Sequence, residues 1–289
     1  MNRRPASAAG FTLIEAIMVI VITGILAGVV AVFITKPVEG YVDSVRRAEL
    51  TDTADVVLRR MMRDIRLSLP NSLRVTSSGG VNYIEFIMTS AGGRYRDPAD
   101  GSSSGDFLSF TSSTDLSFDV LGTMPASPAV AVNDYVAVYN LGPGYEPGNA
   151  YNYNGSSCLA GGCNIAKVSG VAGNVITLDA NPFAAQTPPL PSPSARFQVI
   201  PGAVRAVTFA CPTTGTGSLT RYWNYGFNTA QATPPTGGNS APLANGASCV
   251  VEYTANATGR NGLLFVQLTL SSGGENVSMF QQIHVDNAP

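Results

Sequence analysis

The 289-residue sequence has few charged side chains and almost no histidine or lysine. Lys, Arg, Asp and Glu make up 12% of the chain, and its formal net charge is −2. Because nucleic-acid binding depends on concentrated positive charge, we expect no nucleic-acid partner. No glycine-rich phosphate loop precedes Lys36 or Lys167, the two lysines of the chain. We therefore expect no nucleotide or other cofactor.

Catalytic patterns are equally scarce. Residues 101–105 match G-x-S-x-G, but a nucleophile elbow needs a strand before it and a helix after it. This match lies in a Ser/Gly-rich stretch, and the single histidine, His284, stands in a strand pattern that favours a structural or exposed role. Asp97, Asp100 and Asp106 flank the same stretch without the spacing of a calcium-binding EF-hand. We therefore expect a protein that is not an enzyme and holds no metal.

Four cysteines point to an oxidising compartment. Cys158 and Cys163 share a Gly/Asn-rich loop, whereas Cys211 and Cys249 each stand at the edge of a predicted strand. Three disulfide pairings are possible, and we favour Cys158–Cys163 with Cys211–Cys249 while the other two stay open. We do not expect a zinc site, because short C-x₂₋₄-C spacings are not present on both sides and only one histidine is available.

One apolar run dominates the amino-terminal part. Residues 16–35 are twenty positions without a charge, and a helix of that length covers about 30 Å, the thickness of a bilayer's hydrocarbon core. Glu15 stands at its leading edge. Arg3 and Arg4 precede it, so the positive-inside rule places residues 1–10 in the cytoplasm and predicts export of the chain beyond the run.

The small residues 6–10 precede this run, whereas a secretory signal peptide carries them after it. Gly10-Phe11-Thr12-Leu13-Ile14-Glu15 and the apolar run resemble the prepilin-peptidase site of type IV pilins and of type II secretion pseudopilins. The resemblance implies cleavage between Gly10 and Phe11, N-methylation of Phe11 and an assembly role for Glu15. It also implies prepilin peptidase, other pilin subunits and a pilus assembly platform as partners.

An acid at the edge of a membrane helix needs a physical reason, because burying its charge is costly. After cleavage, the nearest positive group to Glu15 is the α-amine of Phe11, on the same chain or on the adjacent subunit. An ion pair between Glu15 of one subunit and the α-amine of the next, in a low dielectric, would favour addition of a subunit in the correct register. The alternative is a carboxylate at the membrane interface that reaches water between the headgroups.

Three segments are predicted: a leader at 1–10, a long helix at 11–69 and a β-rich domain at 70–289. Residues 11–35 of the helix would lie in the membrane or the filament core, and Pro37 is expected to bend the helix beyond them. The later part of the helix carries apolar residues at helical spacing, a stripe that would cover a sheet: Leu50, Ala54, Val57, Leu58, Met61, Met62, Ile65 and Leu69.

Beyond Pro70, short β-branched and aromatic runs between turn residues predict antiparallel strands, and hence an α+β fold. Long loops are expected at 142–164, 179–195 and 227–248, and the proline-rich 179–195 is a candidate boundary between two sheets. The expected strands cover 83–88, 107–111, 116–121, 135–139, 175–178, 197–200, 204–209, 219–225, 250–253, 263–270 and 277–285.

Three later segments, at 197–202, 221–225 and 281–287, resemble the larger minor pilins, in particular those of mannose-sensitive haemagglutinin (MSHA) pili. The resemblance implies a minor pilin for assembly, initiation or the tip, held in the bacterial inner membrane with a periplasmic carboxyl terminus and later in a pilus at the cell surface. The alternatives are a minor type II secretion pseudopilin and a membrane-anchored exported enzyme or sugar-binding module. For the last, Tyr222, Trp223 and Tyr225 are a candidate platform, although core packing is favoured.

Overall fold

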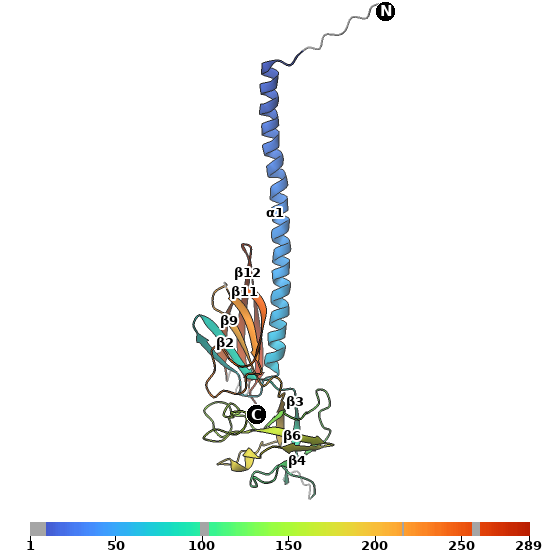
Figure 1. Ribbon diagram of the computed structural model, residues 1–289, viewed down its shortest axis with the longest axis vertical. Helices are drawn as coiled ribbons and strands as arrows, with labels where there is room; N and C mark the ends of the chain where they lie inside the picture. The colour runs from blue at the N-terminus through green and yellow to red at the C-terminus, as the bar shows by residue number, and fades with distance from the viewer. Residues whose placement is uncertain (1–9, 99–103, 216, 256–260) are drawn as a thin grey trace, which may run out of the picture. The chain divides into compact units, whose positions relative to one another are not determined.

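The computed structural model describes residues 10–98, 104–215, 217–255 and 261–289. The described chain begins with one long helix, α1 (Leu13–Arg66), and continues as antiparallel β-structure, so the expected α+β class is confirmed (Figure 1). A short 3₁₀ helix, η2 (Pro182–Ala185), lies between β7 and β8. The strands are β1 (Arg74–Ser78), β2 (Val81–Ile87), β3 (Ala91–Tyr95), β4 (Ser117–Leu121), β5 (Tyr135–Ala137), β6 (Ile165–Ala172), β7 (Val175–Leu178), β8 (Arg196–Ile200), β9 (Ala206–Pro212), β10 (Gly217–Trp223), β11 (Asn239–Thr254), β12 (Asn261–Ser272) and β13 (Glu275–Asp286).

The chain forms two compact units that meet between Glu49 and Leu50, inside α1. This division lies inside the helix because the last turns of α1 pack with the β-structure. The helix also ends at Arg66 rather than at residue 69. Leu69 leaves the helical pattern because its N–H donates to the carbonyl of Ile87 at 2.8 Å.

In the first unit, α1 is apolar and exposed. Among the described residues, α1 is the helix that is long and apolar enough to cross a membrane. Its polar side chains are accommodated locally, since the hydroxyls of Thr23 and Thr35 donate to the carbonyls of Val19 and Ala31 at 2.6 and 2.9 Å. α1 continues without a break through Pro37.

In the second unit, the last turns of α1 pack on an antiparallel sheet with the strand order β1-β2-β9-β10-β11-β12-β13. The apolar stripe expected from the sequence supplies the helix side of this core, through Ala54, Val57, Leu58, Met61 and Ile65. The sheet side includes alternate residues of β9 and β12. In β12 buried positions alternate with more exposed ones, whereas β9 is buried on both faces. Burial of each large apolar side chain contributes about 1.5–3 kcal/mol.

The remaining strands form a closed barrel in the order β3-β4-β7-β6-β5-β8, with its own aromatic core. The barrel is an insertion in the sheet, because β2 before it pairs directly with β9 after it, from Val81 opposite Pro212 to Ile87 opposite Ala206. The division between the two β-structures therefore does not fall in the proline-rich 179–195. That segment connects β7 to β8 within the barrel.

One predicted strand is absent, and β1, β3 and β6 form where no strand was expected. Residues 107–111 form no strand; they are held as a loop, in which the amide of Asn181 donates to the carbonyl of Ser109 at 2.9 Å. Conversely, β11 begins at Asn239, inside the predicted loop 227–248. Pro242 has no backbone N–H to donate to a second neighbouring strand. It is tolerated because this part of β11 pairs with β10, where Pro242 lies opposite Thr220, and pairing with β12 begins only at Ala247.

Candidate functional site

The predicted cleavage site lies just before α1. Gly10 and Phe11 have no regular secondary structure, and α1 begins two residues after Phe11, at Leu13. Both residues are exposed, with 79% of the Phe11 surface accessible. A Cβ added at Gly10 would meet nothing within 4 Å, so no described side chain crowds this position.

Thr12 and Glu15 form the amino-terminal cap of α1. The hydroxyl of Thr12 accepts a hydrogen bond from the Glu15 N–H at 3.3 Å, and the Thr12 carbonyl accepts one from the Ala16 N–H at 3.1 Å. The spacing is that of a T-x-x-E capping box, a signal that our sequence analysis missed. An acid in the first turn also interacts favourably with the helix dipole, by about 0.3–1 kcal/mol. Glu15 thus has a local structural role besides any role in assembly.

The apolar surface of the first unit has no partner within the described chain. Between Leu13 and Val42, nearly every large apolar side chain is exposed, including those of Ile14, Ile25 and Phe33. A continuous apolar surface of this kind needs lipid or other apolar helices around it. Gly24 and Gly28 have the G-x-x-x-G spacing, and both are open, since a Cβ at either would meet nothing within 4 Å.

The cysteines are joined as the sequence analysis favours. Cys158 pairs with Cys163 across a separation of five residues, and Cys211 pairs with Cys249 across 38. The second disulfide connects β9 with β11 inside the core shared by α1 and the sheet. No described cysteine remains free, and no three His, Cys, Asp or Glu residues of the described ranges gather as metal ligands.

The candidate aromatic platform is not formed, because Tyr225 belongs to a buried polar network. Its hydroxyl donates to a carboxylate oxygen of Glu85 at 2.9 Å, and Arg74 Nε lies 2.7 Å from the other oxygen. Glu85 is fully buried, and this burial raises the pKa of its carboxyl above the ordinary value, with Arg74 acting in the opposite direction. The guanidinium of Arg74 in turn lies 3.8 Å from the centre of the Tyr151 ring.

Trp223, the second member of that platform, packs partly buried against the core of α1 and the sheet. Arg221 lies over its ring at 5.0 Å and donates to Asp64 of α1 at 2.9 Å. These contacts connect β10 to α1. Trp223 and Tyr225 each pack partly buried against a core, so the favoured interpretation of core packing applies to both.

The other catalytic candidates are not brought together. His284 is exposed on β13, on the same face as Gln282 and Asp286. Asp100 and residues 101–103 of the G-x-S-x-G match lie outside the described residues. Asp106 accepts a hydrogen bond from the Ser117 hydroxyl, which is a contact within the barrel rather than a ligand arrangement.

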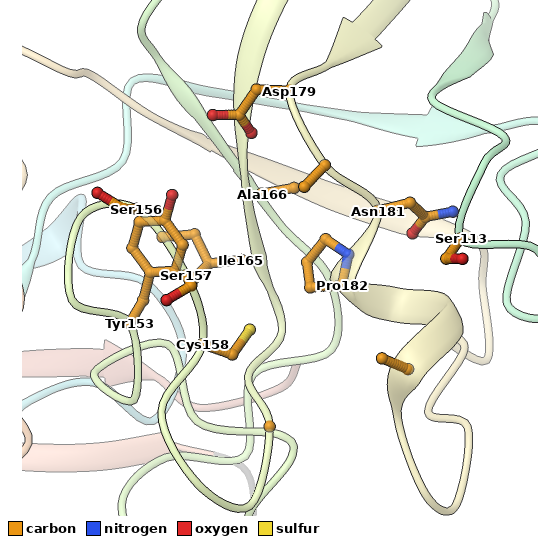
Figure 2. Close-up of a pocket in the computed structure, with 13 residues that line it drawn as sticks. Ser113, Tyr153, Ser156, Ser157, Cys158, Ile165, Ala166, Asp179, Asn181 and Pro182 are labelled. Atoms are coloured by element: carbon orange, nitrogen blue, oxygen red, sulfur yellow. The ribbon is translucent and has the colours of Figure 1, made fainter.

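A small pocket of about 290 Å³ lies beside the first disulfide. Figure 2 shows Tyr153, Ser156 and Cys158 on one side of it and Asn181 and Pro182 on the other. Asp179 and two further serines complete its polar lining. In the described chain, no hydrogen bond joins a serine of this pocket to the Asp179 carboxylate, so a nucleophile paired with a base is not formed here.

The described chain therefore joins one candidate membrane helix to an antiparallel β-rich unit with two disulfides, an architecture consistent with that of pilins. The cleavage and assembly candidates Gly10, Phe11 and Glu15 lie together at the start of that helix. Comparison of the chain with family models, with curated proteins and with solved structures finds no match.

Proposed function

We propose that this chain is a non-enzymatic minor pilin of a type IV pilus of the MSHA kind, which is processed by prepilin peptidase and acts in pilus assembly, initiation or at the tip. The observation that carries the proposal is the exposed, non-helical Gly10–Phe11 bond directly before a capped helix with an exposed apolar surface. In this proposal, Phe11 becomes the methylated amino terminus.

The apolar part of α1 would act as an inner-membrane anchor before assembly and as a packing element in the filament core afterwards. Transfer from lipid to a bundle of apolar helices gains little hydrophobic energy, because both surroundings are apolar. Close packing at Gly24 and Gly28 and the charge of Glu15 would then select the register. The partner of Glu15 in this account is the α-amine of Phe11 on the adjacent subunit, since opposite charges attract strongly where water is excluded.

The second unit supports export. Its two disulfides suit an oxidising compartment, and the buried pairing of Cys211 with Cys249 is part of its core. We propose that this unit lies in the periplasm before assembly and at the pilus surface after it.

Purified pili test the proposal. Pili sheared from cells should contain the mature chain at low abundance, and deletion of the gene should reduce pilus number while protein secretion continues. A chain that is missing from pili, and whose deletion instead blocks secretion of exported enzymes, would identify a minor pseudopilin of a type II secretion system. A chain that is missing from pili, and whose deletion leaves both pilus number and protein secretion unchanged, would contradict both assignments.

A further inference from the structure

A tyrosine-lined groove of about 600 Å³ opens on the second unit. We call it the tyrosine groove, and define it by Asn71, Tyr139, Pro143, Tyr145, Tyr253 and Asn287. Tyr139 and Tyr145 lie in the same loop after β5, whereas Tyr253 lies far later in the chain, near the end of β11. The volume is within the range of about 300–1,000 Å³ that is typical of small-molecule sites.

The groove includes two of the six described non-glycine residues that have positive φ angles. Asn71, Tyr139 and Gly142 all have positive φ angles, of 59°, 50° and 90°. Such a conformation is uncommon for a bulky residue such as tyrosine. Gly142 is required where it is, because a Cβ there would lie within hard contact of the Asn71 carbonyl oxygen, at 2.4 Å. Strained residues persist where the surrounding structure holds them, and they cluster at binding and catalytic sites.

The groove is also held rigidly by hydrogen bonds. The loop that carries Tyr145 is closed by the Leu141 N–H, which donates to the Gly148 carbonyl at 2.7 Å. The Asn71 side chain donates to the Asn140 carbonyl at 2.8 Å, and the Asn287 side chain donates to the Ala255 carbonyl at 2.7 Å. The Tyr145 side chain, 65% exposed, is therefore presented on a preorganised loop rather than packed into a core.

The chemistry of the lining selects the class of ligand. Phenol rings offer apolar faces with a hydroxyl at the edge. The asparagine amides are largely engaged by the chain itself, since Asn71 donates to Asn140 and Asn287 donates to Tyr253 and Ala255. No charged side chain occurs among the described residues that line the groove, so the side chains there offer ring faces and hydrogen-bonding groups rather than charge. A neutral sugar has the complementary surface, with C–H groups on its ring faces and hydroxyls around its rim.

We propose that the tyrosine groove binds a neutral saccharide, with Tyr145 as the exposed stacking residue. This inference does not rest on the assignment as a pilin, because it uses only the geometry of the second unit. It also differs from the platform at Tyr222–Tyr225 considered from the sequence, since Tyr225 is committed to the network of Glu85.

The test is binding of simple sugars to the full chain in a polyoxyethylene detergent, because detergents with sugar headgroups would compete. The probes are glucose, galactose, mannose, N-acetylglucosamine and their disaccharides, with glucuronic acid as a charged comparison and a proline-rich peptide as a competing ligand class. Binding is followed by saturation-transfer NMR and titration calorimetry. At least one neutral sugar should bind, and Tyr145→Ala should weaken that binding by roughly 3- to 10-fold through loss of one stacked ring.

A matched variant guards against general effects of removing an aromatic side chain. Phe280 on β13 is 71% exposed, similar to Tyr145, and lies outside the groove, so Phe280→Ala should leave sugar binding unchanged. The proposal is overturned if no neutral sugar binds, if only glucuronic acid or the peptide binds, or if Tyr145→Ala binds as well as the unchanged chain. None of these results depends on whether the leader is cut, so this inference can fail while the proposed function stands.

Discussion

The hydroxyl of Thr12 accepts a hydrogen bond from the backbone N–H of Glu15 at 3.3 Å, at the first turn of the apolar helix. Glu15 therefore occupies the third position of a capping box, where Glu and Gln are both favourable. An effect of removing this residue can arise from the helix end or from its charge. Glutamine separates the two, because it keeps the capping residue type and removes the charge.

We predict that Glu15→Gln and Glu15→Ala are both cleaved and inserted into the membrane but enter pili poorly. In a partly dehydrated site, loss of one close ion pair is enough for at least about a tenfold decrease in incorporation. The measurement is the ratio of the subunit in sheared pili to the subunit in membranes. Normal incorporation of Glu15→Gln with poor incorporation of Glu15→Ala would mean that capping, rather than charge, is the role of Glu15.

The packing of α1 on the sheet gives a second prediction. Met61 is fully buried in the shared core, whereas Val56 on the same helix is 66% exposed. Met61→Ala should lower the free energy of unfolding by about 2–5 kcal/mol, and Val56→Ala should change it by no more than about 0.5 kcal/mol. Denaturant unfolding followed by fluorescence of Trp223, the single tryptophan, measures both. Equal effects of the two variants would contradict the packing described here.

The two disulfides should contribute unequally to the free energy of unfolding. The bond between Cys211 and Cys249 closes a separation of 38 residues, and that between Cys158 and Cys163 closes five. Loop-closure entropy then assigns about 4 kcal/mol to the longer bridge and about 2 kcal/mol to the shorter one. Double Cys→Ala variants, unfolded under the same oxidising conditions, measure the difference. A larger loss from removal of the short bridge would contradict this ranking.

The buried Glu85 makes stability depend on pH. Its folded-state pKa is raised above the ordinary 4.5, chiefly by burial, so the folded protein holds this proton more tightly than the unfolded chain does. The stability contributed by Glu85 is therefore fully present below the ordinary pKa and is lost as pH rises through the raised value. Glu85→Gln should remove this decline in unfolding free energy as pH rises above the ordinary pKa of the Glu85 carboxyl. Parallel pH profiles for the two proteins would contradict the assigned direction.

Local patterns in the sequence predicted the elements that depend on neighbouring residues. The uncharged run and the stripe around Met61 indicated α1 and its buried face, because both arise from helical spacing. The boundaries of β7 were predicted without error, since a short β-branched run between turn residues is a local signal. The capping box at Thr12 and Glu15 was equally local and was simply overlooked.

Contacts between distant segments could not be predicted in the same way. The pairing of Ile87 with Ala206 makes the whole barrel an insertion, and nothing near either residue signals it. The burial of Tyr225 depends on Glu85 and Arg74, which lie far earlier in the chain. The tyrosine groove likewise assembles from segments that carry no motif of their own.

The central claim is that the chain is cut after Gly10 and enters a filament through the apolar part of α1. The most direct test is the intact mass and amino-terminal sequence of the protein from its native membrane, with and without prepilin peptidase. The account predicts a chain that begins at N-methylated Phe11 and appears only when the peptidase is present. A chain that still begins at Met1, or one cut after the apolar run, would contradict it.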